Sequence, residues 1–206
     1  MSTPEHRVVN RRIRDFFDGH AARWDECMSA DHTDRLERIL NTIDIEPGQR
    51  VLDVGAGNGV LIPLLERRLA PRGTVVSIDI AGGMLLEARR RYPRALLAQT
   101  DVLDLSFARE AFDWVLCNSC FPHFTDPARA LAELTSALKA GGQLLVCHTR
   151  SREVINEHHR HVGDVVGGHE IPTDNAMRAL MAAAGLQTST SRDDEAGYFL
   201  LADKAR

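Results

Sequence analysis

The segment that most constrains this chain is Val51-Leu52-Asp53-Val54-Gly55-Ala56-Gly57-Asn58-Gly59. Here an apolar strand pattern runs into a turn with three glycines, and a helical pattern follows. Glycine lets the backbone turn tightly and lets another molecule come close to it. A strand that passes through such a turn into a helix is typical of a parallel sheet that binds a ligand at the carboxyl ends of its strands. The turn alone does not identify that ligand.

Short apolar runs rich in β-formers alternate with helical stretches from about residue 50 onward. This alternation predicts βαβ units and therefore an α/β fold with a parallel sheet. The expected strands are 50–54, 74–79, 95–100, 112–118 and 143–148, and the expected helices lie near 59–69, 82–91 and 127–139. Ala140-Gly141-Gly142 stops the last of these helices before the fifth strand.

Two regions lie outside this repeat, although 206 residues suit a single domain. We expect residues 1–46 to form a helical cap of two helices, and residues 47–150 to form the core that carries the glycine turn. A histidine-rich insertion at 151–172 is expected to cover the site. A helix at 173–184 and short strands near 186–189 and 197–202 complete the chain.

Composition limits the class of partner. The formal net charge is -4, with acids and bases intermixed, which disfavours a nucleic-acid substrate. No run of 18 apolar residues is present to span a membrane. The first residues carry several arginines but no apolar stretch of a secretory signal, so we expect a cytoplasmic protein. A monomer and a homodimer are both compatible with the sequence.

Carboxylates end three of the expected strands. Asp53 lies two residues before the first glycine, where it would repel a diphosphate and suit a cation. Val60 stands where a dinucleotide-binding turn would have its third glycine. Asp79 can accept from ribose hydroxyls, and Asp101 can accept from an adenine amino group. S-adenosylmethionine fits this pattern because it carries an ammonium and a sulfonium beside its adenosine.

The same residues resemble the class I S-adenosylmethionine-dependent methyltransferases, and more narrowly the methyltransferase type 11 group with its ubiquinone and menaquinone biosynthesis enzymes. The resemblance covers roughly residues 12 to 150. It rests on the segment from Asp53 to Gly59, on Asp79 and Asp101, on Phe112-Asp113, on Leu138-Lys139-Ala140-Gly141-Gly142, and on Phe16-Phe17-Asp18 through Arg23-Trp24-Asp25 as a helix that closes over the cofactor. It implies a Rossmann-like three-layer sandwich whose seven-stranded, mostly parallel sheet has an antiparallel last strand. It also implies a small-molecule methyl acceptor.

Cofactor roles follow from this resemblance. It places them on Asp53, Gly55, Gly57, Asp79, Ile80 and Asp101. Neighbours on the same turns complete the cofactor contacts that we expect: Ala56, Asn58, Gly59, Met84, Val102 and Asn118.

Histidines are the candidates for chemistry on the acceptor side. Methyl transfer from a sulfonium is an in-line displacement, so alignment supplies much of the rate and a base is needed only for an acceptor that must lose a proton. Histidine suits that role because its ordinary pKa is near neutrality. We favour His148, at the end of the fifth strand, as base or acceptor ligand, followed by His123 and His159.

The insertion is expected to contain a helix at about 151–166. Its apolar residues place His158 near the centre of the face turned toward the site and His159 on the flank of that face. Trp24, Phe121 and Phe124 either line the acceptor pocket beside these histidines or pack in the core.

A metal site is the sharper alternative for this region. Thiolate and imidazole are ligands that zinc prefers, and the candidate donors are Cys117, Cys120, His123, Cys147, His148, His158, His159 and His169. We favour buried thiols and a polar pocket wall over a bound metal. A third hypothesis is that these residues line a pocket for a methyl acceptor that is a soft or metal-containing molecule.

Two other functions compete with a methyltransferase. One is a nicotinamide oxidoreductase, which Asp53 and Val60 oppose. The other is a non-catalytic adenosylmethionine-binding sensor of thiols or metals. The sequence does not identify the acceptor atom.

Overall fold

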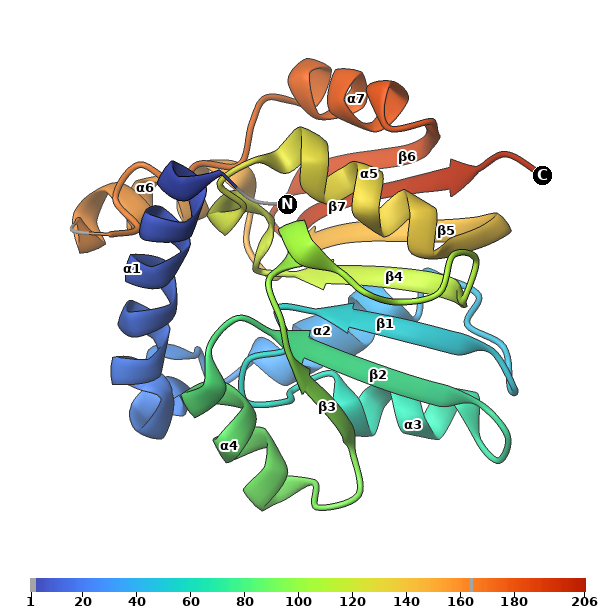
Figure 1. Cartoon of the computed structure of the whole chain (residues 1–206), viewed down its shortest axis with the longest axis horizontal. Helices are drawn as coiled ribbons and strands as arrows, with labels where there is room; N and C mark the ends of the chain where they lie inside the picture. Colours follow the sequence, from blue (N-terminus) through green and yellow to red (C-terminus); the bar gives the residue numbers. More distant parts are fainter. Residues whose placement is uncertain (1–2, 164) are drawn as a thin grey trace.

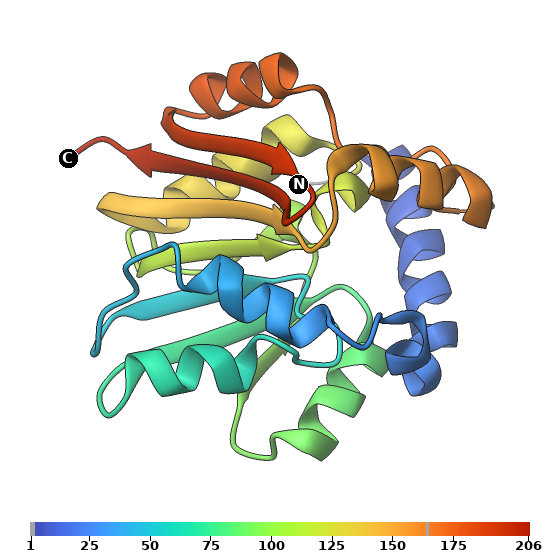
Figure 2. The same ribbon diagram turned by 180° about the vertical axis from the view of Figure 1, so that it is seen from behind.

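The computed structural model describes residues 3–163 and 165–206 and has one seven-stranded sheet with helices on both faces (Figures 1 and 2). The strands are β1 (Arg50–Val54), β2 (Thr74–Asp79), β3 (Leu96–Gln99), β4 (Phe112–Asn118), β5 (Leu138–His148), β6 (Leu186–Asp194) and β7 (Gly197–Lys204). Their order in the sheet is β3-β2-β1-β4-β5-β7-β6. Neighbours from β3 to β5 pair in parallel, and β7 pairs antiparallel with β5 and β6. The predicted fold class is confirmed.

Helices α5 (Pro127–Ala137) and α7 (Asp174–Ala183) cover one face of the sheet, and α2 (His32–Leu40) and α3 (Ile62–Leu69) cover the other (Figures 1 and 2). Alternate strand residues feed the two faces, since successive side chains of a strand point to opposite sides. Leu144 and Val146 of β5 therefore join the first core, whereas Leu145 and Cys147 join the second. Helix α4 (Gly82–Arg91) packs beside β2 and β3.

A third group of helices lies across the carboxyl ends of the parallel strands. Helix α1 (Pro4–His20) continues into the 3-10 turn η1 (Ala21–Cys27), and α6 (Arg152–Val162) lies near the start of α1 (Figure 1). Short 3-10 turns η2 (Val102–Asp104) and η3 (Phe121–His123) follow β3 and β4. None of the helices among the described residues is both long and apolar enough to cross a bilayer.

Most expected elements are found, and the differences have local causes. Helix α3 begins only at Ile62, because the glycine turn and a further turn occupy residues 55–61. Strand β5 begins at Leu138 rather than 143, since Leu138 already pairs with Phe112 of β4. The last two strands form a longer hairpin than the sequence pattern predicted.

Helix α6 departs most from its prediction. It ends at Val162, where Gly163 has φ +63°, and two of the apolar residues assigned to its inner face are exposed, Val154 by 50% and Val162 by 42%. The buried residue is Asn156, whose side chain donates to the carbonyl of Ile171 at 3.1 Å and accepts from its N–H at 2.8 Å. The residue of α6 that points inward is therefore a polar one, which makes the hydrogen bonds of a loop backbone.

Candidate functional site

The glycine turn lies at the carboxyl end of β1. Gly55, Gly57 and Gly59 all have left-handed φ values, which L side chains rarely adopt. A Cβ on Gly55 would lie 2.3 Å from the Cβ of Cys120, so glycine is required by the close approach of the segment after β4. Near Gly57 the closest heavy atom to such a Cβ is Nε1 of Trp24 at 3.9 Å. The turn is thus closed on the Cys120 side and open toward the N-terminal cap.

Two buried carboxylates lie behind this turn. Asp79, at the end of β2, accepts from the N–H of Gly57 and of Ala81, both at 2.8 Å. Asp53 accepts from the hydroxyl of Ser77 at 3.0 Å. Burial raises the pKa of both groups, and that of Asp53 rises to about 7. A nearby cation would reverse that shift, so the pair favours a positively charged ligand.

A third carboxylate follows β3. Asp101 caps η2 by accepting from the N–H of Leu103 at 2.9 Å, and its other oxygen accepts from the amide of Asn10 in α1. Val102 is buried below it. The carboxylates of residues 53, 79 and 101 therefore share one edge of the sheet, because parallel strands end at the same edge.

The N-terminal cap, α1 with η1, is held over this edge by side chains. Asp18 accepts from the N–H of Gly83 at 2.6 Å, and Asp25 accepts from Asn58 at 2.7 Å and from Arg91 at 2.6 Å. A small apolar cluster completes the contact: Ala21, Ala81 and Met84, with Phe17 and Trp24 packed against them. These contacts join the cap to the glycine turn and to α4.

The segment after β4 forms the opposite wall. Asn118 is buried, and its side-chain oxygen lies 3.7 Å from the Sγ of Cys147. Ser119 has φ +55°, an uncommon left-handed conformation outside glycine, and sequence patterns gave no sign of it. Phe121 is buried in the main core, whereas Phe124 is partly buried beside it, with ring centroids 5.3 Å apart. Phe121 is therefore a core residue and not an open pocket wall.

Four histidines from separate segments gather next to this wall. This histidine cluster comprises His123 of η3, His148 at the end of β5, His159 of α6 and His169 of the following loop. The ring centroids of His123 lie 5.1 Å from those of His159 and 5.2 Å from those of His169, and the Nδ1 atoms of His123 and His169 are 2.9 Å apart. Burial, and then the neighbouring imidazoles, lowers the pKa of all four. The cluster is therefore neutral at physiological pH.

His148 is the most buried of these residues, at 1% exposure. Within the described part of the chain neither of its ring nitrogens has a hydrogen-bond partner, and the hydroxyl of its neighbour Tyr198 also has none. Burial lowers the pKa of His148 to about 3. Because neither ring nitrogen has a partner among the described residues to stabilise a ring cation, they suit hydrogen bonding to a bound molecule better than proton removal.

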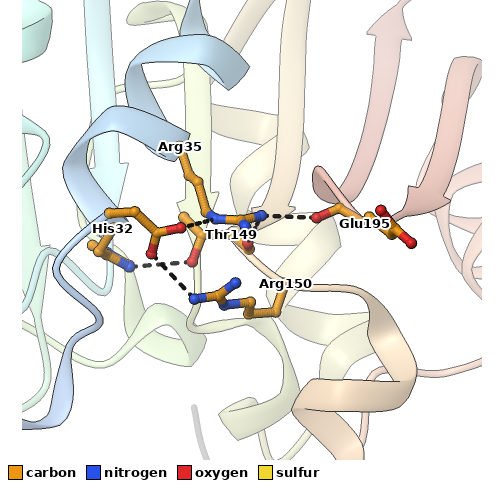
Figure 3. Close-up of polar contacts among 6 residues, drawn as sticks. His32, Arg35, Thr149, Arg150 and Glu195 are labelled. Atoms are coloured by element: carbon orange, nitrogen blue, oxygen red, sulfur yellow. Dashed lines mark hydrogen bonds and ion pairs between the residues drawn. The ribbon is translucent and has the colours of Figure 1, made fainter.

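A polar network on the other side of β5 fixes the end of this strand (Figure 3). The hydroxyl of Thr149 lies 3.1 Å from Nδ1 of His32 in α2. Arg35 donates to Asp31 at 2.6 Å and to the carbonyl of Glu195 at 2.8 Å, and Arg150 donates to Asp31 at 3.1 Å. The arginines drawn in this view are paired, and the network holds His148 at the carboxyl edge.

The expected inward position of His158 is wrong. His158 is exposed, and the inner side of α6 carries His159, whose Nδ1 contacts the carbonyl of His169. The reason is the rotation of α6 that buries Asn156. From the sequence, His169 was predicted only as one of several candidate metal donors. Its contact with His123 could not be predicted, because a loop residue has no periodicity that would indicate its partner.

The cysteines of this region are buried thiols. Cys120 donates to the carbonyl of Val54 at 3.1 Å, and burial raises the pKa of both Cys120 and Cys147. Among residues 3–163 and 165–206, no group of three His, Cys, Asp or Glu side chains is placed to hold a metal ion.

Two surface cavities, of about 330 and 520 Å³, lie at the amino ends of the parallel strands. The first is lined by residues at the starts of β2 and β3, and the second by residues at the start of β6 and the end of β7. Both are remote from the carboxylates and histidines, so neither belongs to the site.

Comparisons with known proteins agree with this geometry. Residues 52–146 match a family described as "Methyltransferase domain". The chain is 31% identical to a demethylmenaquinone methyltransferase of Renibacterium salmoninarum, covering 92% of this chain and 74% of the relative. It is also 31% identical to a ubiquinone/menaquinone biosynthesis C-methyltransferase of Methylococcus capsulatus, covering 83% and 72%. Several further relatives are matched over only 56–61% of their own length.

The fold has a close counterpart among solved structures. A Burkholderia thailandensis 1,6-didemethyltoxoflavin-N1-methyltransferase, solved with bound 1,6-didemethyltoxoflavin and S-adenosylhomocysteine, superposes with a TM-score of 0.73 at 18% identity. The match covers 100% of this chain and 92% of that one. The glycine turn, the carboxylates at the strand ends and the two relatives above 30% identity lead to one conclusion. This chain belongs to the class I S-adenosylmethionine-dependent methyltransferases.

Proposed function

We propose that this protein transfers the methyl group of S-adenosylmethionine to an uncharged small molecule held by the histidine cluster. The proposal is supported by the gathering of several functional groups at one edge of the sheet. Three carboxylates and an open glycine turn lie there under a helical cap, next to a buried neutral histidine whose ring nitrogens are unpaired. The relatives named for quinone methylation, and the absence of a net positive charge, support a small acceptor over a nucleic acid.

The residues present fit the cofactor. Asp79 would accept hydrogen bonds from the ribose hydroxyls. Asp101 would accept one from the adenine amino group, which would replace its present hydrogen bond from Asn10. Gly55 and Gly57 leave the backbone free of side chains where the amino acid portion would lie, and buried Asp53 complements its positive charge. The indole Nε1 of Trp24 lies close to the glycine turn. Ile80, Met84, Val102 and Asn118 would complete the surroundings.

The bound cofactor supplies an electrophilic methyl group and a neutral thioether leaving group. What the protein adds is alignment and the exclusion of water. The cap covers the reacting groups, His148 orients the acceptor through a hydrogen bond, and His123 stands ready to take a proton.

Calorimetric titration of S-adenosylhomocysteine tests the cofactor assignment. We expect Asp79→Ala to weaken binding by about 30-fold, the equivalent of roughly 2 kcal/mol for lost charge-assisted hydrogen bonds. Asp79→Asn, which keeps one acceptor oxygen and the size of the side chain, should weaken it less. The exposed Asp44→Ala is the matched control and should bind as the native chain does.

Two results would overturn the assignment. One is tight binding of NADH in place of S-adenosylhomocysteine. The other is an unchanged affinity in Asp79→Ala, which would mean that the adenosine is held elsewhere. Formation of S-adenosylhomocysteine from S-adenosylmethionine with a panel of quinols, phenols and heteroaromatic acceptors then tests catalysis.

A further inference from the structure

The loop between α6 and α7 brings an additional residue to the site. His169 lies in this loop, its N–H donates to the carbonyl of Val166 at 3.0 Å, and its own carbonyl accepts from Nδ1 of His159. The loop is tight, because a Cβ on Gly167 would lie 2.9 Å from the Cα of Gly163. The backbone of His169 is therefore fixed from two sides, and its imidazole is presented to His123.

The contact between His123 and His169 constrains where their protons lie. Two Nδ1 atoms 2.9 Å apart form a hydrogen bond only if one is protonated and the other is not. If the Nδ1–H of His123 donates, its Nε2 keeps a lone pair. If the Nδ1–H of His169 donates, the Nε2 of His123 must carry the proton in the neutral ring. The pair thus decides whether His123 is an acceptor or a donor.

Burial decides between these two arrangements. The His123 ring packs on Phe17 of the cap, at 5.1 Å between centroids, and is surrounded by the imidazoles of His148 and His159. His169 is partly exposed, so an N–H on its Nε2 is hydrated at little cost. An N–H on Nε2 of His123, whose ring is packed among those of Phe17 and His159, would lose more of its hydration. The favoured arrangement has His123 donating through Nδ1 to Nδ1 of His169.

We propose that His169 is a positioning residue that holds His123 as the Nδ1–H tautomer, so that its Nε2 is the atom that accepts the proton of the methyl acceptor. This inference rests on the proposed function. In the step, the acceptor X–H bond breaks and its proton moves to Nε2 of His123. The electron pair on X attacks the methyl carbon, and the carbon–sulfur bond breaks to leave S-adenosylhomocysteine.

The charge balance of this step explains why a neutral partner is useful. The imidazolium formed on His123 donates through Nδ1 to neutral His169, and the proton leaves to water when the product departs. The groups that face the pair are the neutral imidazoles of His148 and His159 and the ring of Phe17. On the flanking segments, Arg160 and Glu170 are bonded to each other at 2.5 Å. His169 therefore supplies the orienting acceptor at this position.

Long-range ¹H–¹⁵N correlation spectra of the histidine rings, recorded on the full chain with S-adenosylhomocysteine, test the tautomer directly. We expect His123 to be protonated on Nδ1 and bare on Nε2. His169→Ala should convert His123 to a mixture of tautomers, whereas His169→Asn should restore the native pattern, since an amide oxygen can accept in place of Nδ1. His161→Ala is the control, because His161 is exposed and its Nδ1 contacts the carbonyl of Glu157 in its own helix.

Turnover with 1,4-dihydroxynaphthalene as the probe acceptor tests the role. We expect His169→Ala to lower kcat by about 10–100-fold with little change in KM, and His169→Asn to recover most of the loss. The inference fails if His123 carries its proton on Nε2, or if His169→Ala leaves the His123 tautomer unchanged. Native protein that binds S-adenosylhomocysteine but methylates no acceptor would instead count against the proposed function, and the ring spectra would still decide the tautomer.

Discussion

Asp53 was predicted from the sequence as a ligand-binding residue, and the structure shows in addition that its carboxylate is buried. In the sequence, Asp53 stands where it would repel a diphosphate. In the structure Asp53 is buried, is bonded to Ser77 and has its pKa raised to about 7. The carboxylate is therefore held at an energetic cost when no cation is near. This cost is the expected signature of a residue that serves binding at the expense of stability.

Replacing Asp53 by Asn tests this view. The folded pKa of about 7 exceeds the unfolded value of 3.8, so the folded state binds more protons between these pH values and stability falls as pH rises through that window. Asp53→Asn should raise the free energy of unfolding at pH 8 by about 2–4 kcal/mol, with a much smaller gain at pH 4. It should also weaken S-adenosylmethionine binding.

Urea unfolding at pH 4 and pH 8, with calorimetric titration of the cofactor, measures both effects. Asp44→Asn, an exposed carboxylate, provides the baseline. A loss of stability at pH 8 in Asp53→Asn would contradict the assignment of a buried, strained carboxylate.

At the level of the element, the sequence predicted some pieces well for a clear reason. Strands β1, β2 and β4 and helix α4 begin and end as expected, because each is an apolar run or an amphipathic repeat between strong turn residues. The glycine turn and Asp79 followed from the same pattern. The inward face of helix α6 was predicted wrongly. Asn156 is buried there through hydrogen bonds to Ile171, and the spacing of apolar residues does not indicate a buried asparagine. His169 was missed as the partner of His123 for a similar reason.

The cap is an element whose attachment can be tested at one residue. Asp25 joins η1 to Asn58 of the glycine turn and to Arg91 of α4. Because its side chain is 63% exposed, Asp25→Ala should change the free energy of unfolding by less than about 1 kcal/mol. Loss of its contacts should nevertheless speed dissociation of S-adenosylhomocysteine by roughly 10-fold, a change of about 1.4 kcal/mol.

Stopped-flow displacement, followed by the fluorescence of Trp24, measures that rate. Glu26→Ala is a matched control, since Glu26 is the adjacent carboxylate and pairs with Arg23 of the same turn. An equal acceleration in both variants would show that the contacts of Asp25 do not hold the cap.

The whole molecule combines a well-packed sheet with a lightly attached cap. The sheet has two apolar cores, one on each face, whereas α1 and η1 are joined to it by a few side-chain hydrogen bonds and a small apolar cluster. Local stability should therefore differ between these parts, because opening a segment with few buried contacts costs little free energy.

Hydrogen exchange followed by mass spectrometry measures this difference. Amides of residues 4–27 should exchange quickly in the free protein and slow markedly with S-adenosylhomocysteine, while amides of β1 and β4 remain slow in both states. Helix α7, remote from the ligand, serves as an internal reference. Equal protection of residues 4–27 with and without the ligand would show that the cap is already fixed.

Phe17 gives this architecture a thermodynamic consequence. Its ring lies 5.5 Å from Trp24, beside the glycine turn, and 5.1 Å from His123, so one side chain faces both compartments. A ligand bound on either side of Phe17 would order α1. The second ligand would then bind without the entropic cost of ordering this helix. Cofactor and acceptor should therefore strengthen each other's binding by the same factor, whichever arrives first.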